Sequence, residues 1–245
     1  MAVVVRFVGS GDAFGSGGRL QTCIHVRTDA SVFLIDCGAS SLIGMKAGGL
    51  DPNEVETVFL THLHGDHFGG LPFMILDGQI SHRFRPITVA GPPGVRERVM
   101  ATMEDLFPGS STVRRGFALR FVELPAGVES VVGTLAVVPY EVVHESGAPA
   151  YALRISCDGR VIAYSGDTAW TDRLVEASAG ADLFVCEALF FEKTVPYHLD
   201  YATLAGHRSA LSCRRLVLTH MATDMLGHLA EIEVEHADDG MEFVL

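Results

Sequence analysis

The 245-residue chain is predicted to be an α/β protein whose sheets pack face to face with helices outside. Three observations predict this class. Short apolar runs rich in β-branched residues recur along the chain, each bounded by Gly, Pro, Asp or Ser. Amphipathic segments of helix length lie between some of these runs. No linker and no charge run divides the chain, so residues 1–245 are expected to form one domain.

The expected elements alternate irregularly along the chain. The strand-like runs are Val3–Val8, Val32–Ile35, Val55–Leu60, Ile87–Ala90, Leu119–Val122, Leu135–Val143, Tyr151–Ile155, Val161–Tyr164, Leu183–Cys186 and Leu216–Leu218. Helices are predicted over roughly 68–80, 93–107, 170–179 and 200–212. The turn Gly91-Pro92-Pro93-Gly94 leads into the second of these helices, because Pro is favoured at a helix start.

Composition excludes several classes of protein. A hydrophobic fraction of 48% is too high for a disordered chain, and no apolar run reaches the ~20 residues that span a bilayer. The N-terminus has no basic segment of a signal peptide, so a cytoplasmic protein with no membrane partner is expected. The net charge of −12 disfavours a nucleic acid held mainly by phosphate neutralisation. No Cys-x-x-Cys pair occurs, and Cys37 and Cys186 are expected to be buried small apolar residues.

The strongest motif follows the run that ends at Leu60. His62, His64, Asp66 and His67 place three imidazoles and a carboxylate within six residues. Such a mixed donor set favours borderline divalent metals. Gly65 is expected to permit a tight turn, and Gly69-Gly70 a close approach of the backbone.

Three further candidate ligands follow other predicted strands. His144 comes after Leu135–Val143, Asp167 after Val161–Tyr164, and His220 after Leu216–Leu218. Strand ends hold side chains rigidly, as metal coordination requires. The sequence therefore predicts one metal centre built from distant segments.

With these residues the chain resembles the metallo-β-lactamase superfamily, and within it the ribonuclease Z-like phosphodiesterase branch. The matching segments are the loop Thr61–Gly70, His144 in Val-Val-His-Glu-Ser, Asp167 in Tyr-Ser-Gly-Asp-Thr and His220 in Leu-Thr-His-Met. The resemblance covers nearly the whole chain and implies a four-layer αββα sandwich with metals at one rim.

The resemblance also implies a division of labour among the ligands. One divalent ion would take His62, His64 and His144, and a second would take Asp66, His67 and His220. Asp167 would bridge the two, with a shared hydroxide as the nucleophile. Zinc is the expected metal, with Mn²⁺ or Fe²⁺ as alternatives. True metallo-β-lactamases carry Cys at the bridging position, so β-lactam cleavage is not expected.

Catalytic roles are carried over in the same way to Glu187, His198 and Asp66. His198 would protonate the leaving oxygen or stabilise the phosphorane, with Glu187 holding its ring. Asp36 is expected to support the ligand loop without touching metal. The loop Gly9–Gly15 is only a weak phosphate-site signal, since no helix or Lys completes it. Five histidines match no ligand position and are expected at the surface or hydrogen-bonded: His25, His82, His207, His228 and His236.

The substrate is expected to be a small phosphodiester. Only 23 residues separate His144 from Asp167, so the arm with which bacterial ribonuclease Z grips tRNA is absent. Three alternatives stay open: tRNA 3′ processing of the ribonuclease Z type, another ester hydrolase (a lactonase or arylsulfatase), and a non-hydrolytic iron oxidoreductase or binding protein. A homodimer is possible, with Gly91–Gly94 and its helix as a candidate interface.

Overall fold

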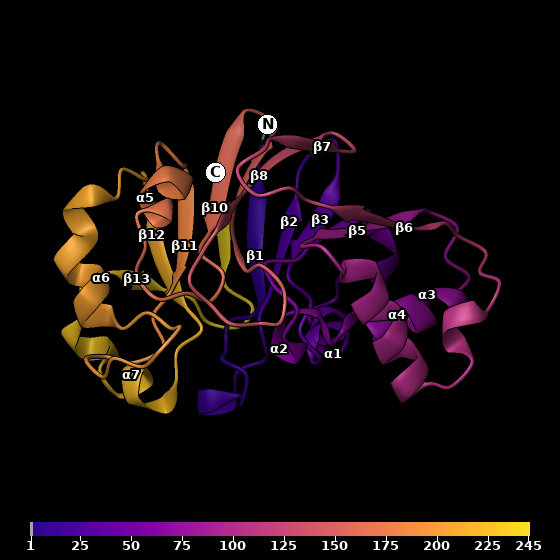
Figure 1. The fold of residues 1–245 in the computed structure, drawn as a ribbon, viewed down its shortest axis with the longest axis horizontal. Helices are drawn as coiled ribbons and strands as arrows, with labels where there is room; N and C mark the ends of the chain where they lie inside the picture. Colours follow the sequence, from indigo (N-terminus) through magenta and orange to yellow (C-terminus); the bar gives the residue numbers. More distant parts are fainter. Residues whose placement is uncertain (1) are drawn as a thin grey trace.

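A computed structural model describes residues 2–245 and places two seven-stranded sheets face to face (Figure 1). The first sheet has the order β14-β1-β2-β3-β4-β5-β6, and the second β13-β12-β11-β10-β9-β8-β7. The first comprises β1 (Val4–Gly9), β2 (Cys23–Arg27), β3 (Val32–Ile35), β4 (Thr57–Phe59), β5 (Ile87–Gly91), β6 (Leu119–Glu123) and β14 (Glu242–Val244). The second comprises β7 (Ser130–Val132), β8 (Leu135–Glu141), β9 (Tyr151–Cys157), β10 (Arg160–Tyr164), β11 (Leu183–Glu187), β12 (Leu216–Thr219) and β13 (Glu235–His236).

Helices cover the outer face of each sheet. The first sheet carries α1 (Ser41–Ala47), α2 (Gly65–Phe68), α3 (Leu71–Ile80) and α4 (Val95–Leu106); α3 and α4 lie on the right of Figure 1, and α1 and α2 near its lower centre. The second carries α5 (Arg173–Ser178), α6 (Tyr201–His207) and α7 (Thr223–Gly227), on the left. The expected four-layer αββα sandwich is therefore confirmed. No helix within residues 2–245 is long and apolar enough to cross a membrane.

Three apolar layers hold the sandwich together. The central layer lies between the sheets and includes Phe7, Phe33 and Phe59 from the first and Tyr151 and Ile162 from the second. The two outer layers lie between each sheet and its helices. Strands such as β1 contribute to the central layer and to one outer layer, because successive side chains point to opposite faces. Phe7 faces the partner sheet, and Val8 faces the helices.

Four neighbouring strands of each sheet run parallel, which brings their C-terminal ends to one rim. β3, β4, β5 and β6 are parallel neighbours, as are β10, β11, β12 and β13. Polar residues that follow strand ends therefore meet at this rim, as ligand sites do in open α/β sheets.

The segment between His144 and Asp167 is a simple hairpin. β9 and β10 pair antiparallel around Asp158-Gly159, and both turn residues have positive φ, 45° and 74°. Such a turn matches the right-handed twist of the strands. The predicted lack of an arm between these two residues is confirmed.

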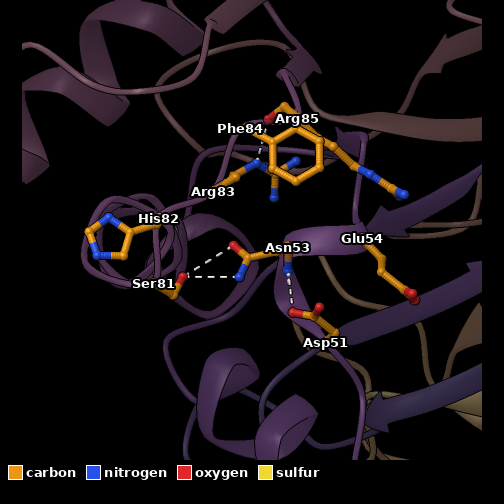
Figure 2. Close-up of a pocket in the computed structure, with 8 residues that line it drawn as sticks. All are labelled: Asp51, Asn53, Glu54, Ser81, His82, Arg83, Phe84 and Arg85. Atoms are coloured by element: carbon orange, nitrogen blue, oxygen red, sulfur yellow. Dashed lines mark hydrogen bonds between the residues drawn. The ribbon is translucent and has the colours of Figure 1, made fainter.

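A hollow lies at the N-terminal ends of the parallel strands of the first sheet, away from the C-terminal rim (Figure 2). Its residues stabilise the fold. It contains Phe84 and the buried Arg83, whose segment precedes the N-terminal end of β5. The Arg83 guanidinium donates to the carbonyl oxygens of Arg85 at 2.7 Å and Pro52 at 3.0 Å, and also to those of Val55 and Pro86. Because these carbonyls engage every guanidinium nitrogen, Arg83 ties loops together rather than offering an anion site.

Candidate metal centre

The structure brings the predicted ligands together at the C-terminal rim. His62 follows β4, Asp167 follows β10 and His220 follows β12. His144 lies three residues after β8, and a bridge between Val143 and Ala169 fixes it beside the Asp167 loop. Asp66 and His67 lie in the short helix α2.

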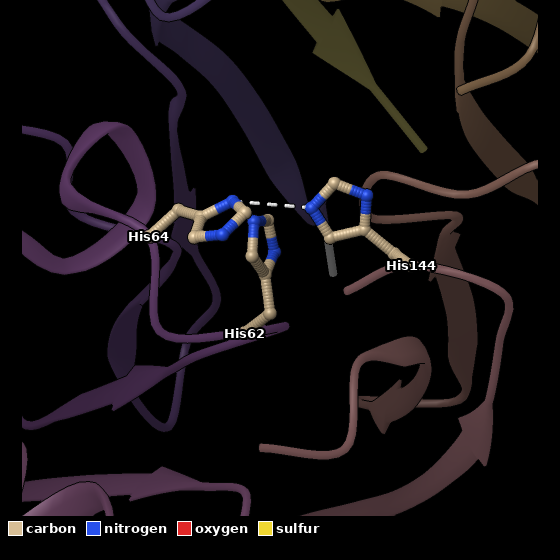
Figure 3. Close-up of side chains that lie close together, drawn as sticks. All are labelled: His62, His64 and His144. Carbon is tan, nitrogen blue, oxygen red and sulfur yellow. Dashed lines mark hydrogen bonds between the residues drawn. The ribbon is translucent and has the colours of Figure 1, made fainter. Parts of the chain in front are cut away.

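Among residues 2–245 the candidate donor atoms form overlapping groups, within each of which they lie within 4.8 Å of one another. One group is His62, His64 and His144, where the Nε2 of His144 lies 3.1 Å from the Nδ1 of His64 (Figure 3). Another is Asp66, His67, Asp167 and His220, and a third, His144, Asp167 and His198, overlaps both. The first two groups contain the two ligand sets that the resemblance implies, with Asp167 lying in the second.

Asp167 lies between the two sets. Its carboxylate is 3.3 Å from the Nε2 of His67, 3.4 Å from that of His220 and 3.8 Å from that of His62. Burial alone would raise its pKa, but His220 and His67 outweigh burial and hold the pKa well below the usual value. The side chain is therefore an anion that lies between the two groups of histidines and could hold divalent ions there.

Three of the histidines form a hydrogen bond through Nδ1, the ring nitrogen that faces away from the cluster, and this bond fixes the orientation of the ring. The Nδ1 of His67 lies 2.7 Å from Asp36, and that of His220 lies 3.2 Å from the hydroxyl of Thr22. The Nδ1 of His144 donates to the carbonyl of Tyr197 at 2.9 Å. With Nδ1 engaged, Nε2 of each ring is left to face the cluster, as in metal-binding histidines.

Asp36 supports the ligand loop as expected. Its buried carboxylate accepts from the amide and the hydroxyl of Thr61, both at 2.8 Å, in addition to its contact with His67. Asp36 and His220 both adopt positive φ, 59° and 57°, which is uncommon for residues other than Gly. Such strain persists only where the surrounding structure holds it, and it clusters at functional sites.

The structure bears differently on the expectations made for Gly65 and Gly70 in the ligand loop. A Cβ on Gly70 would lie 2.2 Å from the carbonyl oxygen of Gly38, so a close backbone approach does require Gly there. Gly65 has no neighbour within 4 Å of such a Cβ and does not adopt positive φ. Gly65 was expected to permit a tight turn; it begins helix α2, and neither its φ nor its surroundings require glycine there.

His198 and Glu187 form a hydrogen-bonded pair beside the cluster. The Nδ1 of His198 lies 3.0 Å from the carboxylate of Glu187, which is fully buried at the end of β11. Burial raises the pKa of the Glu187 carboxyl above its usual value. Burial alone would lower the pKa of His198, but its hydrogen bond to Glu187 outweighs burial and raises that pKa. The pair therefore holds a proton near neutral pH.

The cluster opens into a cavity of about 210 Å³. Its lining is Asp12, Ala13, Phe14, His64, Asp66, Asp167, Leu189, His198 and His220. Phe14 and Leu189 were not predicted. The Gly9–Gly15 loop indicated only a weak phosphate site, and no feature of the sequence placed Phe14 at the mouth of the cavity.

The remaining histidines contribute no ligand to these groups. His207 stacks on Trp170 and His228 on Phe191, with ring centroids 4.0 and 4.3 Å apart. His82 is exposed and His236 is half-buried in β13. His25 is buried rather than at the surface, and within residues 2–245 its Nε2 has no hydrogen-bond partner. Cys37 and Cys186 are buried, as predicted.

Unsatisfied atoms show that the cluster fits divalent ions. Among residues 2–245, the buried Nε2 atoms of His62 and His67 and the Oδ1 of Asp167 have no hydrogen-bond partner. Buried polar groups are normally paired, since leaving one unpaired costs roughly 1–3 kcal/mol. All three atoms point into the two ligand sets, so an ion at each set would satisfy them.

Known proteins share this architecture. The family model described as "Beta-lactamase superfamily domain" matches residues 32–221. Ribonuclease Z of Methanothermobacter thermautotrophicus is 27% identical, covering 89% of this chain and 86% of that protein. Ribonuclease Z of Lachnoclostridium phytofermentans is 24% identical, covering 85% and 84%.

Solved structures agree. Human tRNase Z, short form, superposes with a TM-score of 0.79 at 25% identity, covering 98% of both chains. The metallo-β-lactamase fold protein YhfI from Bacillus subtilis superposes at 0.80 with 18% identity, covering 100% of this chain and 99% of that one, and shows the fold alone. The family match, these relatives and the clustered ligands agree that the chain belongs to the metallo-β-lactamase superfamily as a ribonuclease Z-like, metal-dependent hydrolase.

Proposed function

We propose that the chain is a dinuclear zinc phosphodiesterase of the ribonuclease Z type, with an RNA phosphodiester as its substrate. The observation that carries this proposal is the His198–Glu187 pair beside two groups of candidate ligands, with Asp167 in one group and 3.8 Å from His62 of the other. The relatives named ribonuclease Z support RNA over the small diester that the sequence favoured.

Each group of the site has a distinct task. Two divalent ions in such a site lower the pKa of a bound water and neutralise charge on the phosphoryl oxygen. Glu187 engages the Nδ1 of His198, so Nε2 is the nitrogen left to give a proton to the leaving alcohol oxygen as the P–O bond breaks. Asp66 stays ionised: burial raises the pKa of its carboxyl, but His67 outweighs burial and lowers that pKa to about 2.

A small phosphodiester is the second candidate substrate, and the β9–β10 hairpin favours it. The alignment with the first relative runs over 279 positions, more than the 245 residues of this chain, so that relative carries insertions opposite gaps here. This chain lacks those inserted segments and has a net charge of −12. It therefore offers less surface that attracts a large polyanion such as tRNA.

The test is a comparison of kcat/KM for a precursor tRNA and for thymidine 5′-(4-nitrophenyl phosphate), using zinc-loaded protein. A preference for the precursor of several orders of magnitude supports the ribonuclease, and the reverse supports the second candidate. Protein that holds two zinc ions yet cleaves neither substrate would refute both. His198→Ala serves as the control for activity from a contaminating nuclease.

A further inference from the structure

Among residues 2–245, Phe14 is the most exposed of the large apolar side chains, with 95% of its surface accessible, and it stands at the mouth of the metal cavity. A single exposed apolar residue is ordinary. Phe14 differs because it lines the same cavity as Asp66, His198 and His220. It also borders a second hollow with Arg19 and Ile43, so the ring stands between two depressions.

The backbone holds Phe14 in this place. Asp12, which is buried, accepts from the amides of Phe14 at 3.2 Å and Ser16 at 2.9 Å. Gln21 donates to the carbonyl of Ala13 at 2.9 Å. These bonds fix the turn on both sides of the ring, so the exposure of Phe14 is built into the loop.

The same loop is fastened to a metal ligand. The amide of His220 donates to the carbonyl of Ser10 at 3.1 Å, and Gly11 forms a bridge with Met221. Asp239 accepts from the amides of Ser10 at 2.8 Å and Leu20 at 2.7 Å, at the two ends of the loop. Phe14 therefore has a fixed position relative to the metal centre.

The size of the cavity points to what Phe14 contacts. At about 210 Å³ it is smaller than the roughly 300–1,000 Å³ of typical ligand pockets. A phosphodiester whose phosphorus lies at the metals must place the rest of its ester groups across the rim. The flat, exposed ring of Phe14 is suited there to stack on another flat ring, as aromatic side chains do on bases of single-stranded nucleic acids.

We infer that Phe14 is a stacking platform for a nucleobase next to the scissile phosphate, and hence a specificity-determining residue. This inference rests on the proposed function and adds the recognised group. It predicts that the enzyme distinguishes a nucleotide ester from a purely aliphatic ester of the same charge.

The probes are adenosine 5′-monophosphate and ribose 5-phosphate, which carry the same phosphate and sugar but differ in the base. Calorimetric titration of zinc-loaded protein gives the affinity of each. Phe14→Ala is expected to lower the affinity for adenosine 5′-monophosphate by roughly 5- to 100-fold and to change the affinity for ribose 5-phosphate by less than about twofold. Phe14→Trp should retain the affinity, whereas Phe14→Leu, apolar but without a ring, should resemble the alanine variant.

Phe84→Ala is the matched control. Phe84 is also a largely exposed aromatic residue (78%), but it lies in the hollow at the N-terminal ends of the parallel strands of the first sheet (Figure 2). Its removal should change neither affinity. If Phe84→Ala lowers the affinity for the nucleotide as much as Phe14→Ala does, the effect is not local and the inference is overturned.

Two other outcomes overturn it. If wild type binds the two probes equally, the base has no platform, while the metal phosphodiesterase still stands because ribose 5-phosphate binds. If Phe14→Ala dissociates a dimer in sedimentation without changing the ratio of the two affinities, the ring is covered by a second copy of the chain. Failure of ribose 5-phosphate to bind at all would instead contradict the proposed phosphoryl site.

Discussion

The substitution Asp36→Asn tests how the hydrogen bond to the Nδ1 of His67 controls the affinity of His67 for a metal ion. The carboxylate of Asp36 accepts three hydrogen bonds: two from Thr61 at 2.8 Å and one from the Nδ1 of His67 at 2.7 Å. An amide has one accepting oxygen, so its NH₂ group would face the hydroxyl of Thr61 and the ring of His67. His67 could then pair only by accepting at Nδ1, which moves its proton to Nε2 and blocks the atom that faces Asp66 and Asp167.

The expected loss falls mainly on the second ion. Replacing such partners of metal-bound histidines typically lowers metal affinity about 10- to 100-fold, or about 1.4–2.8 kcal/mol. The set of His62, His64 and His144 does not include His67, so its ion should be affected less. Competition with a chromogenic zinc chelator, fitted with two dissociation constants, separates the two sites.

Asp182→Asn is the matched control for this measurement. Asp182 also pairs with cations, Arg160 at 3.3 Å and Arg214 at 3.0 Å, but it precedes β11 at the end opposite Glu187. Its substitution should leave both zinc affinities unchanged. A folded Asp36→Asn protein that binds two zinc ions as tightly as wild type would show that the tautomer argument is incorrect.

Three further predictions concern the acid, the metals and a buried histidine. His198→Ala should lower kcat about 100- to 10,000-fold on an ester with a poor leaving group, less on a nitrophenyl ester, and leave the metal content intact; equal losses on both esters would exclude a proton donor. Zinc at 100 times its dissociation constant should stabilise the metal-free protein by about 2.7 kcal/mol in thermal unfolding, and a melting temperature insensitive to zinc would count against the two ligand sets. Burial, then Arg27 and Arg6, lower the pKa of His25 to about 4. The unfolded chain therefore binds a proton between about pH 6.5 and 4 that the folded chain does not, so wild-type stability should fall by up to about 3 kcal/mol as the pH drops through this window. Urea unfolding at pH 7 and 4.5 should show a smaller fall for His25→Gln, and parallel falls would rule out His25 as the cause.

The sequence by itself predicted the layers and the candidate ligand residues that the fold brings together. Runs of β-branched residues predict strands from local pattern alone, and His62 to His67 lie within six residues, so no distant segment is needed to recognise the motif. His144, Asp167 and His220 could also be predicted, because each follows a strand and parallel strands end at one rim.

Only the tertiary structure decided elements whose partners are remote. β14 exists because Glu242–Val244 pairs with Val4–Arg6 at the other end of the chain. α1 contains Gly44, which weakens a helix, but a Cβ there would lie 2.6 Å from the Cδ1 of Leu20 and 2.8 Å from the Cγ1 of Val8, so a larger residue would force these side chains to shift. Local propensity cannot show either contact.

The position of Phe14 has the same origin. Its glycine-rich loop has no periodic pattern, and the sequence around it indicates only a turn. The loop becomes part of the metal centre because His220 and Asp239 bind it through Ser10, more than 200 residues away along the chain. Which metal donors the chain carries follows from local spacing, whereas what lies beside those donors depends on contacts between the two ends of the chain.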